Sequence, residues 1–373
     1  MLNEVHISLR QLTIVTIFFT VGSAILITPS GMAESARQDA WIAGLIGIGA
    51  GLPLVWMMAK LVNLYPQKNL TEIIETLLGK WVGKIVSLLL IISFFSAPTA
   101  VLNDLGDFMT TQLIPETPIE AIIILFGAVV LMGVRLGVEV IARSAELLFP
   151  WFILLYFLLV LLVAFNIDPR HLQPVLENGF PPIWQAGLTF LSVAFLPHIA
   201  LLLTLPASLN RPALFGKGIV LGSLIGSLML VAVITLAILV LGVEVTSKSL
   251  YPSYVLAQKI DIGHFLQRVE TIMAIMWFFS LYFRITLYLS SITVSLAQIF
   301  NLKDYRPLVW PLGMLFIVLS FVVYPNVPFR QAWDARTWPS YTIIVGLLLP
   351  LLLLAVHAVR YRLSKKKRTQ QTQ

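Results

Sequence analysis

The sequence predicts an all-α polytopic membrane protein with ten transmembrane helices. Hydrophobic residues make up 58% of its 373 residues, charged residues only 12%, and the mean hydropathy is +0.90. A soluble domain of this size would carry roughly twice that charged fraction. The apolar residues also form long runs such as LFPWFILLYFLLVLLVAF, which is too long and too uniformly apolar for a soluble core helix.

Ten spans follow from these runs in chain order. Their expected bounds are about 9–34, 41–63, 82–106, 118–134, 146–166, 182–208, 215–242, 266–298, 308–325 and 339–360. Between the second and third spans, NLTEIIETLLGKW predicts a short amphipathic surface helix capped by Asn69 or Thr71. In the connection 243–265, YPSYVLAQKI predicts a short helix over the outer face.

The distribution of Lys and Arg predicts that both termini are cytoplasmic. With that topology the inside segments hold seventeen Lys and Arg residues and the outside segments seven, and the one that remains is Arg284, in the middle of span 8. This bias is the pattern that orients membrane proteins. It also accounts for the formal net charge of +7, so a nucleic-acid partner is not expected.

Several chemistries are excluded by what the sequence lacks. There is no cysteine, so disulfides, Cys-ligated zinc and thiol catalysis are ruled out. No phosphate-binding loop, nucleophile elbow, HExxH or dinucleotide fingerprint occurs, so an enzyme is not expected. No second His or carboxylate stands at ligand spacing from His198, so neither a metal site nor a cofactor is predicted.

Two spans are interrupted near their middles. VGSAIL places Gly22 and Ser23 near mid-membrane in the first span, and Pro197 interrupts the sixth. Unwound backbone in lipid costs several kcal/mol per unpaired group, roughly, so it persists only where it lines a protein cavity. For the first span alone, the alternatives are close packing at Gly22 and a kink at Pro29. Paired interruptions in two five-helix halves favour a transporter-type site built on inverted repeats.

The VGSAIL segment resembles the Gly-rich break in the first helix of amino acid–polyamine–organocation permeases. More closely, the chain resembles the B subunit of spore germinant receptors, the permease-like germination proteins of endospore formers. Beyond the ten spans, the short N-terminus and the basic tail, the resemblance rests on ARSAELLFP at the entry to span 5 and FRITLYLSS in span 8. It implies a LeuT-like fold with a 5+5 inverted repeat, and a role in sensing a small nutrient, often an amino acid.

Arg284, in the middle of span 8, is the least expected residue. An ionisable group there is costly and needs a partner. The resemblance implies a sodium site between the break in helix 1 and helix 8, and we expect the guanidinium to take the place of that ion by binding free carbonyls from Gly22 to Ile25. Because Arg is never neutral at ordinary pH, it would be a fixed cation and not a proton carrier. The alternatives are snorkelling and an ion pair that locks helices.

Other polar candidates have simpler alternatives beside them. Glu146, at the start of span 5, is a candidate proton relay or partner of Arg284, or else an interfacial residue facing headgroups or Arg143. Asp104 and Asp107 share a helix face and could attract an amino group, or they could simply end span 3, and Asp104 is a further candidate relay or ion-pair partner of Arg284. His198 is a candidate proton switch, and its alternative role is hydrogen-bonded packing.

The fold that the resemblance implies also gives expected pocket walls. They surround a small apolar amino acid whose polar end is held by backbone. The expected lining residues are Gly22, Ser23, Ala24, Ile25, Phe94, Pro98, Ala194, Phe195, Leu196, Phe279 and Ile285, with core packing as the alternative for those outside spans 1 and 6. Glycines 218, 222 and 226 in span 7 predict close helix packing instead.

The residues and the resemblance together predict a nutrient-sensing, permease-like subunit of a spore germination receptor. Its partners would be a small nutrient, an A-type membrane subunit and a C-type lipoprotein, in the spore inner membrane or bacterial plasma membrane. One integral domain, 1–373, would hold repeat one at about 9–166, repeat two at about 182–360 and a basic tail at 361–373. The alternatives are a proton-coupled amino acid transporter and a scaffold that no longer binds ligand.

Overall fold

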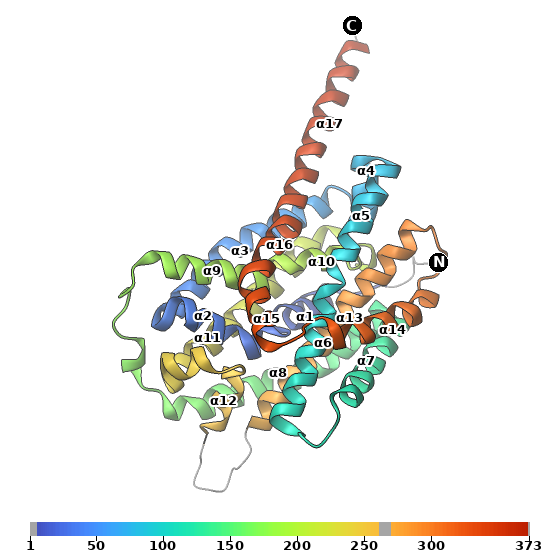
Figure 1. Cartoon of the computed structure of the whole chain (residues 1–373). Helices are drawn as coiled ribbons and strands as arrows, with labels where there is room; N and C mark the ends of the chain where they lie inside the picture. Colours follow the sequence, from blue (N-terminus) through green and yellow to red (C-terminus); the bar gives the residue numbers. More distant parts are fainter. Residues whose placement is uncertain (1–5, 261–269, 372–373) are drawn as a thin grey trace.

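The computed structural model describes residues 6–260 and 270–371 (Figure 1). Within these ranges the regular secondary structure is helical, apart from an isolated bridge between Ile7 and Leu209. The first half of the chain contains α1 (Leu9–Val21), α2 (Ala24–Ala36), α3 (Ala40–Asn63), α4 (Leu70–Leu78), α5 (Lys80–Phe94), α6 (Ser96–Phe108), α7 (Ile119–Leu136) and α8 (Val138–Val163).

The second half repeats the same order of long helices. It contains α9 (Phe180–Ala194), α10 (Ile199–Leu202), α11 (Phe215–Lys248), α12 (Pro252–Gln258), α13 (Glu270–Ile299), α14 (Arg306–Val322), α15 (Val327–Ala332), α16 (Trp338–Ile343) and α17 (Leu349–Gln371). Short 3-10 and π segments join several of these helices, including Leu196–His198 before α10 and the π segments at Trp333–Thr337 and Ile344–Leu348.

The prediction of ten spans is confirmed. Eight helical runs in the described residues are long and apolar enough to cross a membrane, and the shorter apolar helices α1 and α14 accompany them. Since one of the eight runs joins α2 to α3, the spans are α1–α2, α3, α5–α6, α7, α8, α9–α10, α11, α13, α14 and α15–α17. The predicted end of span 7 at 242 coincides with Gly242, where a positive φ of 74° interrupts α11.

Both predicted interruptions are present. The first span stops at Gly22, whose φ of 30° and ψ of −126° suit a residue without a Cβ, and α2 restarts at Ala24. The sixth span stops at Ala194, passes through the 3-10 turn Leu196–His198 and restarts as the short helix α10. Helices α5 and α6 follow each other without such a break, because the backbone of Phe95 between them keeps the α-helical conformation.

The broken helices lie at the centre of the bundle. Helices α1 and α2 pack against α11, α3 packs against α9, and α13 contacts α1, α5 and α8. The close approach of α11 to α1 depends on the predicted glycine ridge, because a Cβ on Gly222 would come within 2.7 Å of the Thr13 carbonyl oxygen. On the other side of α1, the rings of Phe18 and Phe283 are 4.5 Å apart between centroids.

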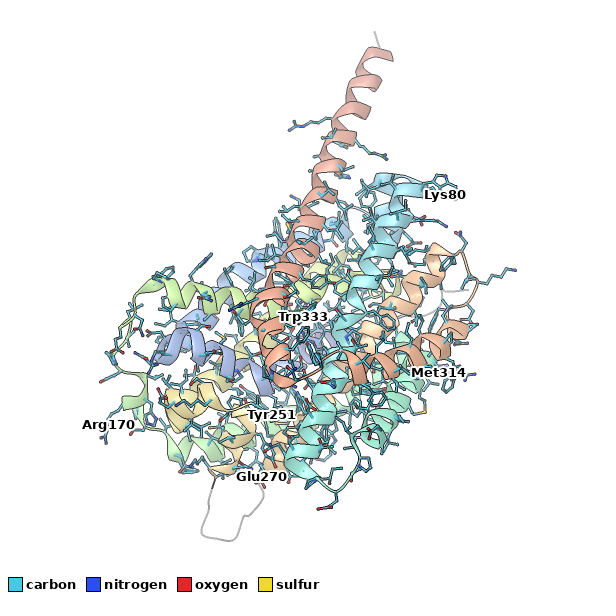
Figure 2. All side chains as sticks on the ribbon, viewed as in Figure 1. Lys80, Arg170, Tyr251, Glu270, Met314 and Trp333 are labelled. Carbon is cyan, nitrogen blue, oxygen red and sulfur yellow. The ribbon has the colours of Figure 1, made fainter. Side chains whose placement is uncertain are left out.

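The two ends of the bundle are distinct. Helices α4 and α17 lie at one end and α12 at the other, and Figure 2 shows Lys80 and Glu270 at these opposite ends. At the α4 end Asn69 caps α4 through a reciprocal capping box with Glu72, which confirms the predicted amphipathic helix and selects Asn69 as its cap. The Asn69 side chain also accepts a hydrogen bond from the Ala207 amide at 3.2 Å, which ties α4 to the chain after α10.

Candidate functional site: a cavity between the broken helices

A cavity of about 570 Å³ opens at the α12 end of the bundle and reaches inward to the break in the first span. Exposed Glu34, Gln185 and Asp334 line its mouth, whereas Ser23 and Arg284 line its buried part. Its walls come from α2, α6, α9, α13 and the segment around α15 and α16. The Trp338 indole donates to the Ser192 carbonyl at 3.2 Å and thereby joins two of these walls.

The backbone at the break is held by serine hydroxyls. The Ser280 hydroxyl of α13 donates to the Gly22 carbonyl at 3.0 Å, and the Ser253 hydroxyl of α12 donates to the Ile25 carbonyl at 2.6 Å. The first bond satisfies a carbonyl that the interruption leaves unpaired, and the second satisfies the Ile25 carbonyl, whose partner within α2 would be Pro29, a residue without an N–H.

Arg284 joins the two broken spans to each other. Its Nη1 donates to the Phe19 carbonyl at 3.2 Å, and its Nη2 donates to the Val193 carbonyl at 3.1 Å. Its Cζ lies 5.3 Å from the centre of the Phe19 ring and 5.9 Å from that of Tyr288, within cation–π range. The residue is 3% exposed, so it does not snorkel out of the bundle.

The predicted carbonyl partners of Arg284 were wrong. The carbonyls of Gly22 and Ile25 are occupied by the two serines, and the guanidinium instead binds one carbonyl from the last turns of α1 and one from α9. The difference has a geometric cause. Gly22 packs directly against the Arg284 side chain, which directs the guanidinium past Gly22 to Phe19.

His198 forms a second buried connection beside the break. One ring nitrogen is 2.9 Å from the Phe195 carbonyl, and the other is 3.0 Å from the Thr20 hydroxyl and 2.9 Å from the Ser223 hydroxyl. The imidazole therefore links α1, the turn before α10, and α11. In the described residues, no cluster of three or more His, Cys, Asp or Glu side chains is placed to hold a metal ion.

A charged clasp closes one side of the cavity mouth. Arg330 of α15 lies 2.9 Å from an Asp104 carboxylate oxygen and 3.1 Å from one of Asp107. Arg330 and Asp104 are 5% and 6% exposed, so this is a buried ion pair. Burial, followed by the charge of Asp104, raises the pKa of the Tyr251 phenol, which faces the clasp in its neutral form. Sequence reasoning missed Arg330, although the three-residue spacing of the two aspartates indicated a shared face.

Glu146 is not the partner of Arg284. It lies in the first half of α8, 3.3 Å from the Arg10 guanidinium, and it accepts a hydrogen bond from the Gln11 side chain at 2.9 Å. Arg143, its other suggested neighbour, pairs with Glu139. Asp104 likewise pairs with Arg330 and not with Arg284. These pairings follow from helix position, because α1 begins beside the first turns of α8 while Arg284 is midway along α13.

The other predicted pocket residues lie around the cavity and not on its surface. Ser23, Asp104 and Arg284 are among the residues that line it. The remaining ones are not, and all except the partly buried Phe279 are buried: Gly22, Ala24, Ile25, Phe94, Pro98, Ala194, Phe195, Leu196, Phe279 and Ile285.

The cavity is instead lined at different heights along these helices, nearer the N-terminal end of α9 and nearer the C-terminal end of α13 than predicted. On α9 the lining residues are Gln185, Thr189 and Val193, spaced four apart on one helix face. On α13 they are Arg284 and Tyr288, again four apart. This spacing is visible in the sequence, but it gives only the face of each helix and not the depth of the cavity.

Comparison with known proteins agrees with this architecture. Among solved structures, the chain superposes on the nucleobase-cation-symport-1 family transporter Mhp1, bound to bromovinylhydantoin, with a TM-score of 0.67, 14% identity, and coverage of 90% of this chain and 76% of that one. It superposes on MhsT in complex with L-phenylalanine with a TM-score of 0.66, 14% identity, and coverage of 93% and 97%. The fold is therefore the LeuT-like 5+5 arrangement with broken first and sixth spans, as predicted.

Sequence comparison identifies the family. The chain is 31% identical to spore germination protein KB of Bacillus subtilis (strain 168), over 95% of both chains. It is 28% identical to the putative spore germination protein YfkT of the same organism, over 90% of this chain and 91% of that one. The family model described as spore germination protein matches residues 6–327. The chain therefore belongs to the spore germination protein family of permease-like membrane proteins.

Proposed function

We propose that this protein is the nutrient-sensing, permease-like subunit of a spore germination receptor. The observation that carries the proposal is the cavity, which is open at one end and reaches the meeting point of both broken helices. A ligand that enters there contacts α2, α9 and α13 at once. It can therefore favour one arrangement of these helices over another, in proportion to its different affinities for the two arrangements.

The proposed ligand is a small molecule, and an L-amino acid fits best. A cavity of about 570 Å³ lies in the range of small-molecule sites. Its mouth carries acidic Glu34 and Asp334, and its buried part carries Arg284, so the charges suit a molecule with an ammonium and a carboxylate group. The complex of MhsT with L-phenylalanine supports this choice, because a protein of the same fold binds an amino acid.

The proposed topology has both termini in the cytoplasm and the cavity open to the outside. Lys and Arg residues favour this orientation seventeen to seven, and it puts α4 and α17 on the inside. The membrane would be the spore inner membrane, and the partners an A-type membrane subunit and a C-type lipoprotein.

A deletion in the native host tests the proposal. Spores and growing cells of the deletion strain are given single amino acids and other nutrients, and germination is scored beside uptake of the same compounds. Lost germination to one nutrient with unchanged uptake is the expected result. Normal germination with lost uptake would instead establish the alternative, a proton-coupled amino acid transporter, and unchanged behaviour in both assays would contradict both.

A further inference from the structure

The charge of Arg284 has no counter-charge in the described part of the chain. The residue is 3% exposed, and the ion pairs found there include none with Arg284. Two carbonyl dipoles and two aromatic rings compensate part of its charge. A buried guanidinium without an anion remains costly, so an anion that enters the cavity would be bound where it removes that cost.

The guanidinium also has hydrogen-bonding capacity to spare. It carries five N–H donors, and two of them serve the carbonyls of Phe19 and Val193. Its Nε is buried and makes no hydrogen bond to the described residues. Because Arg284 is part of the cavity lining, a carboxylate that enters from the mouth can accept hydrogen bonds from guanidinium N–H groups that the two carbonyls leave free.

A second positive feature lies at the same place. Helix α2 starts at Ala24, and Ser23, the residue before it, lines the cavity without capping the helix through its side chain. The first amides of a helix lack partners within the helix and carry partial positive charge. The N-terminus of this 13-residue helix and the Arg284 guanidinium therefore both favour negative charge in the buried part of the cavity.

The acidic residues are at the opposite end of the cavity. Arg330 pairs with Asp104 in the clasp, whereas Glu34 and Asp334 line the mouth without an ion-pair partner in the described residues. Asp334 accepts a hydrogen bond from the Tyr324 hydroxyl at 3.3 Å. The cavity is thus positive at its buried end and negative at its mouth.

We propose that Arg284 directly binds the carboxylate of the ligand, so that only molecules with a carboxylate occupy the buried end of the cavity. This inference rests on the proposed function, in that the ligand enters this cavity. It deepens it by fixing the orientation, with the carboxylate inward and any ammonium group toward Glu34 and Asp334. Neutral sugars and nucleosides are excluded as ligands of the buried end.

Matched ligand pairs test the proposal without any mutation. The full chain is purified in detergent, and thermal unfolding is measured with each of the twenty standard amino acids and with glucose. Each amino acid that stabilises the protein is then compared with its primary amide, which lacks the carboxylate. Loss of a charge-assisted hydrogen bond predicts an apparent affinity at least about tenfold weaker for the amide.

Arg284→Lys keeps the charge and removes the planar fork, and Arg284→Gln removes the charge. Both should weaken binding of the amino acid at least about tenfold, while the difference between the acid and its amide shrinks. Arg135→Lys is the matched control, because Arg135 is exposed and contacts the Trp310 ring, away from the cavity. If Arg284→Gln fails to fold, Arg284→Lys and the ligand pairs still decide the matter.

Three results would overturn the inference. Equal binding of acid and amide, or unchanged binding by Arg284→Lys, would remove Arg284 from carboxylate recognition while leaving the proposed function intact. Stabilisation that depends on chloride and disappears in gluconate, with no competition by amino acids, would assign the site to an inorganic anion. Stabilisation by glucose alone, or by no probe, would reject a carboxylate ligand, and the germination assay would then decide the proposed function separately.

Discussion

Replacing Gly22 by Ala should destabilise the protein more than any other single added methyl group in the first span. A Cβ at this position would overlap the Arg284 Cδ and come within 2.9 Å of its Nη1 and 3.0 Å of the Phe19 carbonyl oxygen. The φ of 30° adds backbone strain of about 1–3 kcal/mol for a residue with a side chain. Displacing the guanidinium costs one charge-assisted hydrogen bond, about 1.5–3 kcal/mol. The expected loss in the free energy of unfolding is therefore about 2.5–6 kcal/mol.

Denaturant unfolding of the purified full chain in detergent measures this loss. Gly49→Ala is the matched control, because Gly49 lies within helix α3 and a Cβ there meets nothing within 4 Å. In the helix interior that change should be neutral or stabilising by up to about 1 kcal/mol.

A double-mutant cycle separates the two causes. In an Arg284→Ala background the clash is gone, so Gly22→Ala should then cost only the strain of about 1–3 kcal/mol. Two results would refute the reasoning: a Gly22→Ala protein as stable as the Gly49→Ala control, or a Gly22→Ala cost that is the same with and without Arg284.

Three further changes test other parts of the structure. Asp104→Asn leaves the buried Arg330 with one carboxylate and should cost about 2 kcal/mol of unfolding free energy, measured by the same denaturant assay, whereas wild-type stability would contradict the clasp. Because the chain has no cysteine, Ser23→Cys should react with a membrane-impermeant thiol reagent that is small enough for the cavity, and the fully buried Ser227→Cys should not; equal labelling of the two would contradict the cavity. Asn69→Ala removes the cap of α4 and should cost about 1–2 kcal/mol, seen also as faster proteolysis near α4, and unchanged stability and proteolysis would show that the capping box contributes nothing.

The sequence predicted those features that depend on local composition. Long apolar runs are sufficient to locate spans, because the bilayer requires about 20 apolar residues in each. The breaks at Gly22 and Pro197 were predictable for a similar reason, since glycine and proline act on their own stretch of backbone. The cap of α4 followed from the spacing of Asn69 and Glu72, which is also a local signal.

Contacts between distant segments were less predictable. The clasp joins Arg330 to Asp104 across 226 positions of sequence, and nothing beside Arg330 in the chain marks it as buried. The partners of Arg284 depend on where its long side chain can pass Gly22, which requires the packed helices and not only their order. The predicted pocket was placed on the correct spans but at the wrong positions along them. Hydrophobic periodicity shows which face of a helix is buried, but not how far along the helix a cavity lies.

The short helix α12 connects the break in the first span to one end of the bundle. The Ser253 hydroxyl of α12 donates a hydrogen bond to the Ile25 carbonyl in the first turn of α2, and α12 also packs on α2, α11 and α13. If α2 tilts about Gly22 and Ser23, this attachment obliges α12 to travel with it or to release the carbonyl. Through this hydrogen bond, a small rotation of α2 about the break would also move α12 at the end of the bundle.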